Sequence, residues 1–305
     1  MKTFTEKEAE CESVFRKEGP FWHLYTDGTV MEDVFVSDEM MKCAMTALAV
    51  EAILNPKVKI ITFELMSNHI HLIIAGPREA ALELFFAFRQ RVVRAFRNLG
   101  VIVDWGKFQA SILSIESLKA LRNEIIYVNR NAFVACSDYT PQNYLWGGGC
   151  AYFSSLINLL PAKGVKDIGF NKARQLTRFR DVKLLEKLKF AEDIVFIPSF
   201  CRIDIGQGLF RDARNYFYLL TKDAETFSQI ATHLKDKIFL IDEELFALAV
   251  KYASAKFNNA RLTMLSPEQK IIVAKELHFR YNASNQQLRR LLRLDASILQ
   301  ELFPY

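Results

Sequence analysis

The sequence predicts an α+β fold, with a mixed N-terminal part and a helical C-terminal part, and three observations support this. β-rich and helical segments alternate over residues 20–135. Half of the residues are hydrophobic and a quarter are charged, which is ordinary for a globular protein. Beyond about residue 165 the alternation stops and the periodicity is helical. The candidate helices there are 180–190, 208–221, 223–236 and 241–257.

The first elements follow from local signals. Residues 1–20 are charged and lack periodicity, so we expect a loose leader. Residues 21–36 read as two strands around Asp27–Gly28, a strong hairpin signal. Ser37 is expected to cap a helix that runs to Leu54.

A second hairpin is expected next, because residues 58–65 and 69–75 are β-rich and only a short polar turn separates them. Residues 78–99 read as a helix that ends at Gly100. A short strand or turn region and a helix over 115–135 follow. This order predicts a ferredoxin-like antiparallel sheet with helices on one face, followed by an all-α C-terminal region.

We predict three parts: an α+β domain over 1–160, a helical linker or accessory region over 161–262, and a helix-turn-helix-like module over 263–305. Ser266 as N-cap and Pro267 at the first helical position begin the module. Two further short helices follow, although a plain helical bundle is the alternative and the third helix is not basic. Candidate DNA-binding residues of the module are Arg289, Arg290 and Arg293.

Composition limits the class of protein. The net charge of +5, from 40 basic and 35 acidic residues, permits a nucleic-acid partner without requiring one. The five cysteines are spread along the chain without a CxxC pair, which favours a reducing compartment and argues against a cysteine zinc site. The polar N-terminus is unlike a signal peptide, and no apolar run reaches about 18 residues. We therefore expect a cytoplasmic protein without a membrane segment.

The segment "MSNHIHLII" places two histidines on one expected strand. Residues i and i+2 of a strand face the same side, so His69 and His71 point together. Two imidazoles so placed can hold one divalent cation or flank a phosphate. The alternative is a pair of partly exposed histidines on a half-buried strand, because a metal site needs a third ligand.

The helix expected over 115–135 offers further polar groups. Tyr127 and Asn131 are neighbours at i and i+4, on the face that also carries Asn123 and Arg130. An ordinary surface tyrosine is the alternative interpretation. The opposite, apolar stripe consists of Leu118, Leu121, Ile125, Val128 and Ala132.

Two motifs resemble a known family. Residues 66–74 are similar to the histidine–hydrophobic–histidine (HUH) strand of the single-tyrosine transposases. Residues 127–132, "YVNRNA", are similar to their nucleophile helix, whose motif reads tyrosine, aliphatic, histidine, any, asparagine, proline. The closest branch is the REP-associated tyrosine transposases, and the resemblance covers residues 20–155. Asn129 stands where the family usually has histidine, and Ala132 stands where it has proline. The resemblance is therefore weaker for the DNA contacts and for the rate of the reaction.

The resemblance implies DNA transposition or recombination by cleavage and transfer of single-stranded DNA. Tyr127 would form a 5′-phosphotyrosine, and His69, His71 and Asn131 would bind Mg²⁺ or Mn²⁺. The partner would be single-stranded or hairpin DNA, and the protein a monomer or homodimer. No nucleotide cofactor is expected, since the chain lacks a phosphate-binding glycine-rich motif. Backbone contacts are expected from Arg91, Arg94, Arg97, Lys107 and Arg130, although a solvated face is the alternative for the first three.

Two other classes of function remain open on the sequence. The protein can be a non-catalytic, domesticated DNA-binding protein or regulator that uses its helix-turn-helix-like end. It can also be a structural or interaction protein with a vestigial site. A covalent adduct with single-stranded DNA that depends on Tyr127 distinguishes the enzyme from both.

Overall fold

The computed structural model describes residues 2–135, 140–220, 224–234, 236, 238 and 240–304. The chain forms two compact units, Met1–Leu220 and Thr221–Tyr305. The observed boundary therefore differs from the sequence-based boundaries after residues 160 and 262. Residues 161–220 belong to the first unit because they bond to its sheet: the backbone N–H of Arg202 donates to the carbonyl of Ile60 at 2.7 Å.

The first unit is built on a four-stranded sheet in the order β2-β3-β1-β4, in which all neighbouring strands are antiparallel. The hairpin predicted for residues 58–65 and 69–75 is confirmed as β2 and β3, except that β3 begins at Ile70, so His69 lies just before the strand. His71 of β3 lies opposite Glu64 of β2 on one side and Tyr25 of β1 on the other. The strands are β1 (Phe21–Thr26), β2 (Lys59–Leu65), β3 (Ile70–Ala75) and β4 (Ala110–Ile115).

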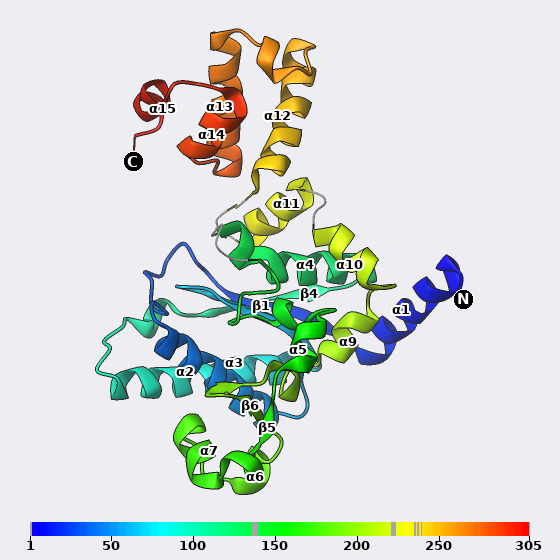
Figure 1. Cartoon of the computed structure of the whole chain (residues 1–305), viewed down its shortest axis with the longest axis vertical. Coiled ribbons are helices and arrows are strands. Elements are labelled where there is room, and N and C mark those ends of the chain that lie inside the picture. Colours follow the sequence, from blue (N-terminus) through cyan, green and yellow to red (C-terminus); the bar gives the residue numbers. More distant parts are fainter. Residues whose placement is uncertain are drawn as a thin grey trace. The chain divides into compact units, whose positions relative to one another are not determined.

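Three long helices pack on this sheet: α2 (Asp38–Leu54), α3 (Arg78–Asn98) and α4 (Leu118–Ala135). The cap predicted for α2 is confirmed, because the hydroxyl of Ser37 accepts from the backbone N–H of Met40. Figure 1 shows α2 and α3 on one side of the sheet and α4 on the other. The prediction of helices on one face was wrong: every residue of β3 is buried, so both faces need a cover.

The N-terminal segment also differs from its prediction. Residues 4–18 form a helix, α1 (Phe4–Glu18), in place of a loose leader. Its start is stabilised by a capping box between Thr3 and Glu6, which outweighs the weak periodicity. Residues 31–36 form no strand, so only the first half of the expected 21–36 hairpin exists. The backbone N–H groups of Val34 and Phe35 donate instead to the carbonyl of Ser67.

Residues 140–220 complete the first unit, and the prediction of an all-α region after residue 160 was wrong. A small antiparallel sheet forms in the order β5-β6-β7. It interrupts the expected 180–190 helix because Phe190 and Val195 are buried and Glu192 takes a left-handed turn conformation, with φ of 55°. The strands are β5 (Lys163–Gly164), β6 (Lys189–Ala191) and β7 (Ile194–Val195).

Short helices make up the rest of this unit. They are α5 (Ser155–Leu159), α6 (Val165–Ile168), α7 (Phe170–Thr177), α8 (Val182–Leu185), α9 (Ile203–Gly208) and α10 (Ala213–Leu220), with 3₁₀ turns η1 (Trp105–Lys107), η2 (Gly148–Ala151) and η3 (Ile197–Ser199). Cys11, Cys43, Cys150 and Cys201 are free thiols, and Cys136 lies outside the described residues.

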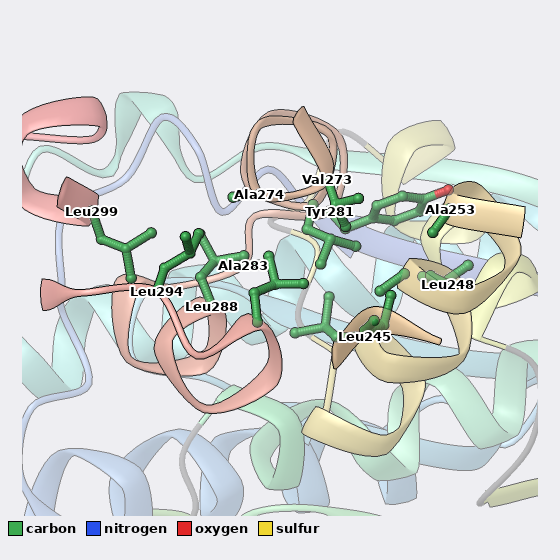
Figure 2. Close-up of a cluster of buried hydrophobic side chains, with 14 of the residues drawn as sticks. Leu245, Leu248, Ala253, Val273, Ala274, Tyr281, Ala283, Leu288, Leu294 and Leu299 are labelled. Atoms are coloured by element: carbon green, nitrogen blue, oxygen red, sulfur yellow. The ribbon is translucent and has the colours of Figure 1, made fainter. Parts of the chain in front are cut away.

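The second unit is helical over its described residues, with its own apolar core. Figure 2 shows side chains of its helices meeting there, including Leu245, Val273, Leu288 and Leu299. The helix start predicted at Ser266 and Pro267 is confirmed. The elements are α11 (Ala224–Leu234), α12 (Asp242–Phe257), η4 (Leu262–Met264), α13 (Pro267–Tyr281), α14 (Asn285–Leu292) and α15 (Ala296–Leu302).

In the part of the chain that the structure describes, no helix combines the length and the apolar character that a membrane crossing requires.

Candidate functional site

A layer of buried polar side chains lies between α4 and the sheet. Directly paired residues of antiparallel strands point to the same side, so Tyr25, Glu64 and His71 share one sheet face. The ring of Tyr127 on α4 lies 5.7 Å from the ring of His71 and 6.4 Å from that of His23, measured between ring centroids. The nucleophile candidate and a ligand candidate, far apart in sequence, are therefore neighbours.

Side chains on two opposite faces of α4 are buried. The predicted apolar stripe is buried, from Leu118 to Ala132. Tyr127 and Asn131, on the opposite face, are only 5% and 3% exposed. Tyr127 is thus not an ordinary surface tyrosine, and Asn131 lies one turn further along the same helix face.

A chain of hydrogen bonds orients His71. Its Nδ1 lies 3.0 Å from Nε2 of His23, and Nδ1 of His23 lies 2.8 Å from a carboxylate oxygen of Glu124. A carboxylate accepts, so Nδ1–H of His23 donates to Glu124. With His23 neutral, its Nε2 then accepts Nδ1–H of His71. This arrangement leaves the lone pair of His71 on Nε2, as a metal ligand requires.

His69 is oriented by a separate set of bonds. The side-chain nitrogen of Asn68 donates to the carbonyls of Gly28 and Met31, at 2.9 and 3.0 Å. Its oxygen therefore faces His69, and Nδ1–H of His69 donates to that oxygen at 2.6 Å. The lone pair of a neutral His69 is then on Nε2. A Cβ atom at position 28 would lie 2.7 Å from Nδ1 of His69, so the glycine makes room for the ring.

The two imidazoles are candidates to hold a shared divalent cation. The ring centroids of His69 and His71 are 4.9 Å apart, and one ligand nitrogen of each ring lies within 4.8 Å of the other. In these tautomers each ring carries its ligand lone pair on Nε2. Asn131, buried on the same face of α4 as Tyr127, carries an amide oxygen of the harder kind that Mg²⁺ and Mn²⁺ accept.

Other groups of the layer tie α4 to β2. Oε1 of Glu64 accepts the backbone N–H of Ala132 at 2.7 Å, and burial raises the pKa of this carboxyl to about 8. Thr62 donates to the side-chain oxygen of Asn129, whose nitrogen donates to the hydroxyl of Tyr216 on α10 at 3.0 Å. Asn129, which departs from the family motif, is therefore a buried structural link.

Three of the predicted basic residues of the first unit lie away from this layer. Arg91, Arg94 and Arg97 lie on α3, across the sheet from α4 (Figure 1). Arg91 is paired with Glu51, its Nη2 2.6 Å from the carboxylate. Arg130 is 2% exposed, so its predicted contact with a DNA backbone does not fit this conformation.

The remaining basic candidates lie at the surface. Lys107 is exposed in η1. In the second unit Arg289, Arg290 and Arg293 are exposed, and Arg290 bonds Asp242 through two nitrogens at 2.6 and 3.0 Å.

Sequence reasoning missed the residues that orient the two rings: His23, Glu124 and Asn68. The sequence contained a signal for His23, because it lies two residues before Tyr25 on an expected strand and is one of only five histidines. Glu124 lies three residues before Tyr127 on the helix, and Asn68 adjoins His69. The register of β1 against β3, which brings His23 next to His71, cannot be read from the sequence of either strand alone.

No protein-family model, curated protein or solved structure matches this chain. The indication of function therefore comes from the buried layer itself, and above all from the proximity of Tyr127 to the oriented histidines.

Proposed function

We propose that the protein is a metal-dependent DNA strand transferase of the single-tyrosine HUH type, with a transposase-like activity on hairpin or repeat DNA. The first unit would be its ferredoxin-like catalytic domain. One observation carries the proposal: the ring of Tyr127 lies 5.7 Å from that of His71, in a layer where hydrogen bonds orient both histidines. A phenol beside two metal-directed imidazoles is an arrangement suited to phosphodiester transfer.

The residues then have distinct roles. His69, His71 and Asn131 would hold Mg²⁺ or Mn²⁺, which when bound supplies Lewis-acid polarisation of the scissile phosphate. The phenol oxygen of Tyr127 attacks phosphorus and its proton is released, while the bond from phosphorus to the 3′ oxygen breaks and that oxygen takes up a proton. The products are a 5′-phosphotyrosine and a free 3′-hydroxyl. Because the phosphodiester bond to the 3′ oxygen is exchanged for one to Tyr127, its energy is conserved. Rejoining of the strand therefore needs no nucleotide cofactor.

Burial places a condition on this reaction. Tyr127 is 5% exposed and His71 is fully buried, so a DNA strand reaches them only after covering residues move. Single-stranded DNA fits this restricted access better than a duplex, because one strand needs a narrower opening. The proposed partner is single-stranded or hairpin DNA, and the restricted access favours its unpaired strand.

The test is formation of a covalent adduct. The full chain is incubated with hairpin-flanked single strands and Mn²⁺, and the products are separated under denaturing conditions. We expect a protein–DNA adduct that Tyr127→Phe abolishes. Tyr25→Phe is the matched control, since Tyr25 is also buried and its ring stacks 6.3 Å from that of His71. Loss of the adduct in Tyr25→Phe alone, or no adduct on any such substrate, contradicts the assignment.

A second candidate is DNA binding without catalysis, and the second unit favours it. Its helices α13, α14 and α15 are each capped at the start, and Arg289 and Arg293 are exposed on and just after α14. Duplex or hairpin binding that Arg289→Gln weakens, together with absence of an adduct, supports this regulator-like function. Absence of both DNA binding and metal binding would instead leave a structural or interaction role.

A further inference from the structure

A basic pocket lies in the first unit away from the polar layer. It has a volume of about 410 Å³ and is bounded by α2, α3 and the residues at the end of α7. This volume is within the range of about 300 to 1,000 Å³ that is usual for small-molecule sites. The polar and aromatic side chains that matter for a ligand are Thr46, Arg91, Arg94, Asn98, Arg178 and Phe179.

Arg91 lines this pocket and is held in place by two neighbouring side chains. Its Nε donates to Oε1 of Glu51 at 2.7 Å, and Glu51 is itself buried. The guanidinium carbon lies 5.5 Å from the ring centroid of Phe179. Because Glu51 offsets its charge and Phe179 limits its movement, Arg91 presents a constrained edge toward the pocket.

Two further guanidinium groups are not offset in this way. Among the residues that the structure describes, neither Arg94 nor Arg178 forms an ion pair with a carboxylate. Arg178 makes one long hydrogen bond, from Nη1 to the carbonyl of Ala95 at 3.5 Å. Its backbone is in the left-handed conformation, with φ of 52°, where it ends α7 and adjoins Phe179. The like charges of Arg94 and Arg178 at one pocket repel each other unless an anion lies between them.

We propose that this pocket binds a phosphate ester, with Arg94 and Arg178 bonding the phosphate oxygens. Guanidinium groups match phosphate geometry through paired N–H donors, and the two arginines come from α3 and from the residue that ends α7. Phe179 and Ala47 add an apolar wall for the rest of the ligand. The volume suits one nucleotide, which can be a free nucleotide or one residue of a DNA strand.

This inference does not depend on the proposed catalysis. The pocket uses α2 and α3, which cover the sheet face opposite α4 (Figure 1). Binding here can therefore persist when Tyr127 is replaced. Failure of the adduct experiment leaves this proposal standing, and failure of phosphate binding leaves the catalytic proposal standing.

The test is calorimetric titration of the full chain at constant ionic strength with inorganic phosphate, dAMP and a short single strand. We expect saturable binding of dAMP that Arg94→Gln and Arg178→Gln each weaken about 10-fold or more. Arg97→Gln is the matched control, because Arg97 is exposed on the same helix but does not line the pocket.

The probes also separate the two sources of phosphate. Comparable affinity for dAMP and for the strand shows that a free nucleotide is a sufficient ligand. Binding of the strand without binding of dAMP shows that the ligand is DNA. In either case Arg94→Gln must weaken the binding. Arg94 is exposed, so this variant is expected to fold. No saturable binding of any probe, or equal weakening by Arg97→Gln, overturns the proposal.

Discussion

His23 and His71 share a hydrogen bond of 3.0 Å between Nε2 and Nδ1, although 48 residues separate them. Through this bond the carboxylate of Glu124 controls which nitrogen of His71 carries its lone pair. Both rings are fully buried, so solvent does not compete for these positions. The orientation of a candidate ligand is therefore set by side chains outside the proposed ligand set.

The first prediction concerns that carboxylate. Glu124→Ala is expected to weaken Mn²⁺ binding by about 10- to 100-fold, since His71 loses its orienting chain. Glu124→Gln is expected to have a smaller effect because its amide oxygen still accepts from His23. Mn²⁺ affinity is measured by calorimetry, with the exposed Glu116→Gln as control. Equal affinity in Glu124→Ala and the unaltered protein contradicts this role.

The second prediction concerns the space beside His69. In Gly28→Ala the new Cβ would lie 2.7 Å from Nδ1 of His69, so the ring must move and its bond to Asn68 is strained. We expect weaker Mn²⁺ binding and a stability loss of about 1 to 3 kcal/mol. Calorimetry and chemical denaturation measure the two effects.

The matched control for that substitution is Gly164→Ala. Its added Cβ meets its nearest atom at 3.6 Å, an ordinary contact, and its φ is −73°. A stability loss of similar size in both variants indicates a general effect of replacing glycine and removes the special role of position 28.

The third prediction is a pH dependence of stability. The pKa of Glu64 rises from 4.5 to about 8 because the carboxyl is buried. Between these values the folded protein keeps a proton that the unfolded chain releases, so stability falls as the pH rises. Glu64 accounts for a decrease of about 1.4 kcal/mol per pH unit there.

Glu64→Gln should remove this contribution, because an amide does not ionise but still accepts from the N–H of Ala132. The unfolding free energy of the variant relative to the unaltered protein is therefore expected to increase between about pH 5 and about pH 8. Urea denaturation at several pH values measures it. A difference that stays constant over this range is inconsistent with a carboxyl that is protonated in the folded protein.

The fourth prediction concerns the independence of the second unit. Leu288 is fully buried in its core, so Leu288→Ala should destabilise this unit by about 2 to 5 kcal/mol. The amide protons of β1 and β3 should keep their exchange protection, since they belong to the first unit. Hydrogen exchange measures both, with the partly exposed Ile298→Ala as control. Equal loss of protection in both units shows that they unfold together.

Local patterns in the sequence were sufficient for much of the secondary structure. Ser37 and Ser266 mark helix starts because a hydroxyl satisfies an otherwise unpaired N–H group close by in sequence. The hairpin at residues 58–75 follows from β-rich runs around a short turn. Where a pattern was weak, packing decided: the short strands β5 to β7 and the cover on both sheet faces depend on burial between distant segments.

The candidate site divides in the same way. The sequence by itself predicted that His69 and His71 point to the same side and that Tyr127 and Asn131 share a helix face, because both periodicities are local. The helix face is as expected, whereas β3 begins only at Ile70 and His69 lies just before it. The tertiary structure alone decided that the helix lies against the strand, that Arg91 pairs with Glu51, and that His23 and Glu124 orient His71. Those relationships depend on strand register and on helix docking, which arise from contacts across the whole unit rather than from any single segment.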